Sequence, residues 1–241
     1  MRYIFEELDF QLTALGDISL RRRSEPKLNG QIVYEVKLGD EFLMSSLFTD
    51  AEVQLAELGL GLLDANDLDI VVGGLGLGYT AAAVLDDTRV RSLKVIDIMQ
   101  PVIAWHQNKL VPLGQRLGSD HRCQLIQGDF FDLAISDTRG FDPAAPDRLY
   151  HGILLDIDHS PEHWLSPGNE GFYCLAGLNK LSLKLLPGGV FGLWSNDPPS
   201  QKFIDLLAQV FTAVTAHVVK FDNPYTGGES SNTVYLGKKA A

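Results

Sequence analysis

The stretch that decides the fold runs from Asp69 to Leu85 and reads DIVVGGLGLGYTAAAVL. It begins with β-forming residues, passes through four glycines in six positions, and ends in a run typical of a helix. Glycines at such a junction let backbone amides approach a ligand without a Cβ in the way, and the helix N-terminus that follows favours a negative group. The spacing departs from the dinucleotide fingerprint GxGxxG, and no phosphate-binding lysine follows.

Strands and helices alternate around this stretch. Apolar runs predict strands at 69–74, 92–98, 122–129, 150–158 and 189–196. Helices are expected at 49–63, 79–87, 101–114, 130–136, 170–186 and 200–211, and a terminal hairpin at 216–223 and 232–239. Nearly continuous apolar strands indicate a parallel sheet that is covered on both faces. The sequence therefore predicts an α/β fold: a Rossmann-like, methyltransferase-type seven-stranded, mostly parallel sheet with a terminal antiparallel hairpin.

The first 48 residues have a different pattern. The short β-like runs DISLRRR, GQIVYEVKL and DEFLMSS are separated by segments rich in turn-forming residues, and LGDE suggests a tight hairpin. We expect a small N-terminal antiparallel β region at 1–48 and a methyltransferase-like Rossmann domain at 49–241.

Composition narrows the classes of partner. The 241 residues carry a formal net charge of −11, which disfavours nucleic acid. The acidic start MRYIFEELDFQ does not resemble a signal peptide, and no apolar run approaches the roughly 18 residues of a membrane span. The two cysteines lack the spacing of a zinc site or a disulfide framework. These features predict a cytoplasmic protein without a nucleic-acid, membrane or metal partner.

Ligands of open α/β sheets lie at the carboxyl ends of the strands, so the residues there are candidates for a site. The first strand ends in the glycine loop. The second ends at Asp97, 19 residues beyond Gly78, which is close to the separation of about 20 expected for a ribose-binding acid. The third ends in Gly128, Asp129 and Phe130, where the acid can accept from the adenine amine with the phenyl ring beside the base. Helix capping is the alternative role for Asp97 and Asp129.

The fourth strand ends in the acidic run LLDIDHSPEHW. Asp156 and Asp158 would share one side of the chain if the strand continues, and there an acid can bind a cation or act as a base toward an amine. Turn-making is the alternative for Asp158. His159 and the residues after it raise metal binding, which the break at Pro161 disfavours. The order of glycine loop, ribose acid, adenine acid and acidic strand end is typical of a class I S-adenosylmethionine site.

The sequence also resembles the spermidine/spermine synthase family of aminopropyltransferases over roughly residues 30–200. The segments that carry the resemblance are IVVGGLGLG, VIDIMQPVI, IQGDFFDL, GILLDIDHSP and GFYCLAGLNKLSLKLLPGGVF. EFLMSS, VGGLGLGYT, LDIDHSP and LWSNDP are more similar still to a bacterial branch labelled spermidine synthase-like. The resemblance implies a β-hairpin region on a methyltransferase-like Rossmann domain and a homodimer. It also implies a small acceptor such as a polyamine, with S-adenosylmethionine or decarboxylated S-adenosylmethionine as co-substrate.

Expected site residues follow from the strand ends and the resemblance together. Those that bind the nucleoside are Gly73, Gly74, Leu75, Gly76, Gly78, Asp97, Ile98, Gly128, Asp129 and Phe130. Those with a catalytic role are Asp156 and Asp158.

The chain departs from the family pattern at three points. Gly76 stands where the family has an acid that holds the donor's amine, and Val95 stands where it has the ribose-binding glutamate. The two acids of the catalytic loop lie two residues apart instead of three. Loss of the loop acid removes an attraction for the decarboxylated donor, and bare amides there would suit the carboxylate of ordinary S-adenosylmethionine. The predictions are a transferase that moves an aminopropyl group, one that moves a methyl group, or a non-catalytic nucleoside-binding module.

Overall fold

The N-terminal part of the chain is a four-stranded antiparallel sheet. A computed structural model describes residues 3–241. The strands of this sheet pair in chain order and are β1 (Phe5–Thr13), β2 (Gly16–Glu25), β3 (Gln31–Leu38) and β4 (Glu41–Ser45), with a short 3-10 helix η1 (Pro26–Leu28) after β2. The tight hairpin expected at LGDE is the β3–β4 turn, where Gly39 has a φ of +57°. Such a left-handed conformation favours glycine.

The rest of the chain is built on a seven-stranded sheet, which confirms the predicted fold class. Its order is β10-β11-β9-β8-β5-β6-β7. The strands are β5 (Leu68–Gly73), β6 (Val90–Asp97), β7 (Cys123–Gln127), β8 (Tyr150–Leu155), β9 (Leu185–Ser195), β10 (Thr212–Asn223) and β11 (Gly228–Lys238). β5 to β9 are parallel, whereas β11 runs antiparallel to both β9 and β10. The chain order reverses between β5 and β8, and ligands of such sheets bind at this position.

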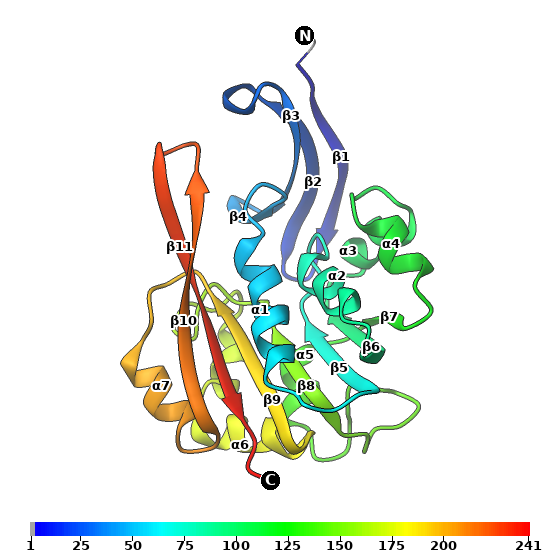
Figure 1. Cartoon of the computed structure of the whole chain (residues 1–241). Coiled ribbons are helices and arrows are strands. Elements are labelled where there is room, and N and C mark those ends of the chain that lie inside the picture. Colours follow the sequence, from blue (N-terminus) through cyan, green and yellow to red (C-terminus); the bar gives the residue numbers. More distant parts are fainter. Residues whose placement is uncertain (1–2) are drawn as a thin grey trace.

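Helices cover both faces of this sheet (Figure 1). The cluster on one face includes residues of α1 (Asp50–Gly61), α2 (Tyr79–Asp86), α3 (Gln100–Gln107) and α4 (Gly114–Ser119). The cluster on the other includes residues of α5 (Phe130–Ile135), α6 (Leu175–Leu183) and α7 (Gln201–Leu207). Successive residues of β5 alternate between them, because strand side chains point to opposite faces: Ile70 and Val72 belong to the first and Val71 to the second.

Two predicted helices were wrong in their extent, and one strand was not predicted. The helix expected at 101–114 ends at Gln107, because Lys109 adopts a left-handed φ of +60° and Pro112 cannot continue a helix; α4 then starts separately. The helix expected at 170–186 is a 3-10 helix, η2 (Pro167–Phe172), followed by α6, and β9 already begins at Leu185. β1 was not predicted, although Leu8, Phe10 and Leu12 alternate with polar residues as in a strand; most of its side chains are exposed.

The N-terminal sheet lies beside the tip of the β10–β11 hairpin (Figure 1). The Tyr225 hydroxyl accepts from Arg23 at 2.8 Å and donates to Glu25 at 2.7 Å. Elsewhere the Trp105 indole of α3 donates to Asp9 of β1 at 2.6 Å. These bonds join residues far apart in sequence and fix the N-terminal sheet over the carboxyl edge of the large sheet. The division into domains after residue 48 stays a prediction, and its first two residues lie outside the described part of the chain.

No helix within residues 3–241 combines the length and apolarity that crossing a membrane requires.

Candidate functional site

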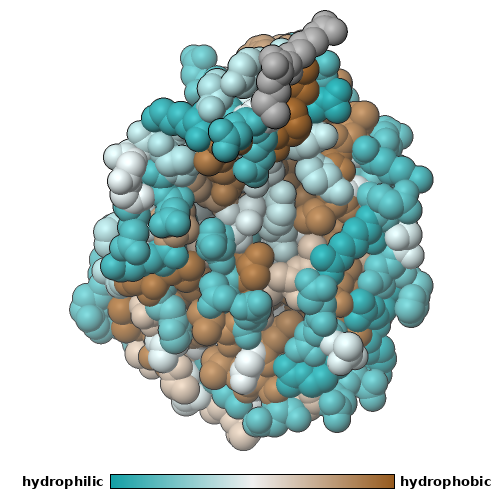
Figure 2. Space-filling model, turned by 45° about the horizontal axis from the view of Figure 1, so that its top comes forward, coloured by the Kyte–Doolittle hydropathy of each residue, from teal (hydrophilic) through white to brown (hydrophobic). Residues whose placement is uncertain are grey.

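A cavity of about 510 Å³ lies at the carboxyl edge of the large sheet, beneath the N-terminal sheet. Loops that follow β5, β6, β7 and β8 contribute to its wall, together with β4, the start of α1, the end of β9 and residues of β10 and β11. The surface that faces the viewer in Figure 2 carries apolar residues in its middle and hydrophilic residues along its sides. Most of the wall is apolar, as in small-molecule sites generally.

The glycine loop forms one side of the cavity through Gly74, Leu75 and Gly76. Gly74 has a φ of +94°, and a Cβ there would overlap the backbone carbonyl of Asp156. Its amide donates to Ile96 at 2.9 Å. The loop thus needs glycine at this position both for its backbone conformation and for its close approach to the neighbouring strand end.

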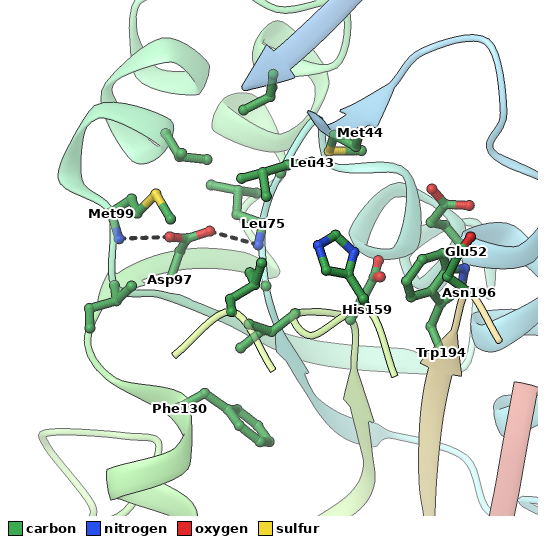
Figure 3. A pocket seen from close by; sticks show the side chains of 18 of the residues that line it. Leu43, Met44, Glu52, Leu75, Asp97, Met99, Phe130, His159, Trp194 and Asn196 are labelled. Carbon is green, nitrogen blue, oxygen red and sulfur yellow. Dashed lines mark hydrogen bonds between the residues drawn. The ribbon is translucent and has the colours of Figure 1, made fainter. Parts of the chain in front are cut away.

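Asp97 fixes the loop from the end of β6. Its carboxylate accepts from the Leu75 amide at 3.0 Å and from the Met99 amide at 2.7 Å (Figure 3). Asp97 lines the cavity together with the half-exposed Ile98. Burial raises the pKa of Asp97, while the backbone amides oppose that rise because they stabilise the charged form. Each oxygen retains a lone pair, so the group can hold the loop and accept from a ligand hydroxyl at once.

Gly76 is the position where sequence reasoning expected bare amides, and here the structure differs. The Leu77 amide donates to the Met44 sulfur at 3.0 Å, and a Cβ on Gly76 would overlap that sulfur. The space that an acid at residue 76 would need is therefore filled by a thioether from β4. The Gly78 amide donates to the Leu75 carbonyl, and the Gly76 amide bonds the Asp97 carboxylate, so the amides of residues 76, 77 and 78 all have partners within the protein.

Three predicted glycines do not line the cavity. A Cβ at Gly73 would overlap the Phe130 ring, and one at Gly78 would overlap Leu117 and His106. The Gly128 amide donates to the Asp97 carbonyl at 3.0 Å. These glycines allow close packing around the loop, and any contact with a ligand stays a prediction for them.

Asp129 and Phe130 border the cavity, and each also has a structural role. One oxygen of Asp129 accepts from the Phe131 and Asp132 amides at 2.9 and 3.2 Å, so this residue caps α5. Its second oxygen makes no bond within residues 3–241 and remains available. Phe130 is 1% exposed and stacks on Phe141, which places most of its ring in the core.

Asp156 lies directly after β8 and faces the same cavity. Its amide donates to the Gly73 carbonyl at 2.8 Å, and its carboxylate accepts from the Thr80 hydroxyl at 2.7 Å. Burial raises the pKa of Asp156 to about 6. The group thus has a fixed orientation and a proton affinity suited to acid–base work near neutral pH.

Asp158, the second predicted catalytic acid, does not line the cavity. It is 2% exposed, and its carboxylate accepts from the Leu165 amide, the Asn169 amide group and the Tyr173 hydroxyl, each at 2.8 Å. Burial raises the pKa of Asp158, and these donors oppose the rise. The three bonds fix the loop between β8 and α6, and a catalytic role for Asp158 stays a prediction without a contact to the cavity.

Several lining residues were not among the expected site residues. Glu52 of α1 is 8% exposed, and its burial and the nearby Asp156 raise its pKa to about 8. The His159 ring contacts Glu41 of β4 at 2.6 Å, and the buried indole nitrogen of Trp194 has no partner within residues 3–241. Figure 3 shows Glu52, Trp194 and Asn196 on one side of the cavity, Asp97 on the other, and His159 between them. Glu52 looked like an ordinary first-turn acid, and only the tertiary fold turns it inward.

The cavity is strongly acidic. Its wall includes Glu52, Asp97, Asp129 and Asp156, whereas no lysine or arginine in residues 3–241 contributes to it. Within the same residues, no group of three or more His, Cys, Asp or Glu side chains is arranged to hold a metal ion. The wall chemistry suits an organic cation with hydroxyl and amine donors.

Comparison with known proteins identifies the fold. No protein-family model matches the sequence. A solved spermidine synthase in complex with the transition state analogue AdoDATO aligns with a TM-score of 0.74 and 15% identity, over 97% of this chain and 74% of that one. A spermidine synthase from Thermotoga maritima aligns with a TM-score of 0.71 and 14% identity, over 97% and 72%. The chain has the methyltransferase-like fold of spermidine synthases.

Proposed function

We propose that this protein is a spermidine synthase-like transferase. It binds a sulfonium nucleoside, S-adenosylmethionine or its decarboxylated form, and transfers an alkyl group to a small amine. The observation that carries the proposal is that the oriented carboxyl of Asp156 shares one cavity with Asp97 and the glycine loop. One cavity thereby offers Asp97 to bind the nucleoside of the donor and Asp156 as a base for the acceptor amine.

The nucleoside half is supported by the wall around Asp97 and Asp129. Asp97 can accept from ribose hydroxyls while it holds Leu75 and Met99. The free oxygen of Asp129 can accept from the exocyclic amine of adenine, and the neighbouring Phe130 also borders this part of the cavity. The acidic wall also attracts the positive sulfonium.

The transfer itself is an in-line displacement. The amine nitrogen forms a bond to the carbon on sulfur, the carbon–sulfur bond breaks, and its electron pair stays on a neutral thioether. An ammonium has no lone pair, so an acceptor that arrives protonated must first lose a proton, which Asp156 takes. Because the sulfonium is already a good leaving group, the protein contributes mainly proximity and orientation.

The transferred group is either aminopropyl or methyl. Methyl transfer is supported by Met44, which fills the space for an acid that would hold the amine of the decarboxylated donor. Aminopropyl transfer is supported by the fold shared with spermidine synthases. Within this family, the proposed relationship is to the bacterial spermidine synthase-like branch, because four short motifs of the sequence resemble that branch.

Product analysis tests this function. The purified protein is incubated with each donor and a panel of diamines, and the products are read by mass. We expect one donor to give an alkylated amine, and Asp156→Asn to reduce the rate by about 10²–10⁴ with donor binding retained. Donor binding without any product would favour a non-catalytic nucleoside-binding module, and failure of both donors to bind would contradict the proposal.

A further inference from the structure

Glu52 is a buried acid that the transfer mechanism does not use. It lies in the first turn of α1, is 8% exposed, and lines the cavity. Within residues 3–241, no other residue donates a hydrogen bond to its carboxyl oxygens, and only its own backbone amide interacts with them. A buried carboxyl that no other residue satisfies is unfavourable, so its position inside a cavity points to a ligand group as its partner.

The two ends of the cavity differ in chemistry. Asp97 and the glycine loop lie on one side in Figure 3, where the Met44 sulfur accepts a hydrogen bond from the Leu77 amide of the loop. Glu52 lies on the other side, near Trp194, whose buried indole nitrogen also lacks a partner within residues 3–241. A positive group on a bound ligand therefore finds its best partners at the Glu52 end and none at residue 76.

Asp156, which follows β8, is the second carboxyl group at the Glu52 end of the cavity. Its carboxylate is oriented by Thr80, and its charge is the largest electrostatic contribution to the raised pKa of Glu52 after burial. Two such carboxyls in an apolar cavity resist being ionised together. The other titratable side chains near Glu52 are Asp50 of α1 and Tyr79 of α2, and His159 after β8 lines the same cavity.

We propose that Glu52 and Asp156 form a two-carboxylate site for the ammonium of an aliphatic amine, which on binding displaces a proton that the pair shares. The charge balances, because one cation enters and one proton leaves. The inference deepens the proposed function, on which it rests for the choice of an amine. The glycine loop lacks an acid that could bind a cationic group, and the inference assigns that role to Glu52 of α1.

A matched pair of small probes tests the site without any variant. Difference infrared spectra at pH 7 are recorded as n-butylamine or the neutral n-butanol is added to the full chain. We expect the amine to remove the band of a protonated carboxyl and to add a carboxylate band, and the alcohol to leave both unchanged. Calorimetry in buffers of different ionisation enthalpy should count about one proton released for each amine bound.

Variants then assign the proton to its residue. Glu52→Gln should abolish proton release and weaken n-butylamine binding by about tenfold to a hundredfold, the value of one charged hydrogen bond. Glu57→Gln is the matched control, because Glu57 is an exposed glutamate of the same helix that bonds Gln54. It should behave like the unaltered protein, and thermal unfolding checks that each variant folds.

The outcomes separate this inference from the proposed function. An infrared spectrum that n-butylamine leaves unchanged, or an equal proton release from Glu52→Gln, would overturn the two-carboxylate site. Methylthioadenosine binding, measured in parallel, reports on the nucleoside half alone. If it binds while the amine has no effect, the inference fails and the nucleoside site stands; the opposite result removes the proposed donor and leaves the amine site.

Discussion

At the scale of single residues, the chemistry depends on two carboxyl groups, Asp156 and Glu52, that differ in their hydrogen bonding. Asp156 is held by Thr80 and by the backbone of β5, whereas no other residue within 3–241 donates a hydrogen bond to the Glu52 carboxyl. Burial raises the pKa of both, to about 6 and about 8. At neutral pH the pair therefore holds close to one proton, and an unoccupied site is poised to exchange that proton for a cation.

Glu52→Gln should change how stability depends on pH. The unfolded pKa of this residue is 4.5, and the folded value is about 8. Below pH 4.5 both states hold the proton. As the pH rises to 8 only the unfolded chain releases it, so the free energy of unfolding falls, by up to about 1.4 kcal/mol per pH unit. The variant lacks this loss, so urea unfolding should find it more stable than the parent at pH 8 and similar at pH 4.5.

Position along the chain was enough to predict part of the site. Asp97 and Asp156 directly follow apolar strands, and strand ends converge in a parallel sheet, so their place on one cavity was predictable. Glu52 and Met44 come from outside the strand–helix repeat, and their inward positions depend on how α1 and β4 pack. Asp158 is near Asp156 in sequence, but the chain turns after β8 and directs it to Asn169 and Tyr173 instead.

At the scale of elements, β4 acts on the glycine loop through one side chain. Gly76 has a φ of +45°, and any side chain there would meet the Met44 sulfur. The loop conformation and the position of the N-terminal sheet are thus coupled through this contact.

A double-mutant cycle measures that coupling. Gly76→Ala should destabilise the protein by about 1–3 kcal/mol, from overpacking and from the left-handed backbone. Met44→Ala creates the missing space, so the double variant should be more stable than the sum of the single changes by about 1 kcal/mol in urea unfolding. Strict additivity would show that the two residues are not in contact.

The hairpin tip provides a second link between elements. Tyr225→Phe removes the hydroxyl that bonds Arg23 and Glu25, and we expect a loss of about 0.5–1.5 kcal/mol. Amide hydrogen exchange should accelerate most at the β10–β11 turn, because the other strands keep their ladders. If amide hydrogen exchange accelerated equally along the whole chain, Tyr225 would not stabilise the hairpin tip locally.

Elements with strong periodicity were predicted well, and the errors have physical causes. The five parallel strands are buried on both faces and therefore read as continuous apolar runs. β1 pairs only with β2 and is mostly exposed, so its sequence carries no such signal. The helix at 101–114 was overextended because its apolar spacing continues past the left-handed turn at Lys109.

At the scale of the whole molecule, the negative charge and the apolar cavity both favour binding of a cation. The net charge is −11, and the cavity wall contributes four carboxyl groups with no basic partner from residues 3–241. The N-terminal sheet and the β10–β11 hairpin border this cavity through Met44, Phe221 and Asn232. A cation is drawn toward the molecule and then held where apolar walls strengthen the interaction.

The homodimer implied by the resemblance is also a prediction at this scale. Sedimentation equilibrium should give twice the mass of one chain across a range of concentrations. A single species with the mass of one chain would contradict it.

The most direct test of the central claim is a calorimetric titration with methylthioadenosine, which carries the nucleoside and thioether without a charged tail. We expect saturable binding of one molecule per chain. Binding to Asp97→Ala should be at least tenfold weaker, because this variant loses a charged acceptor for the ribose hydroxyls. No binding by the unaltered protein, or equal binding by Asp97→Ala, would contradict a nucleoside site at the ends of β5 and β6.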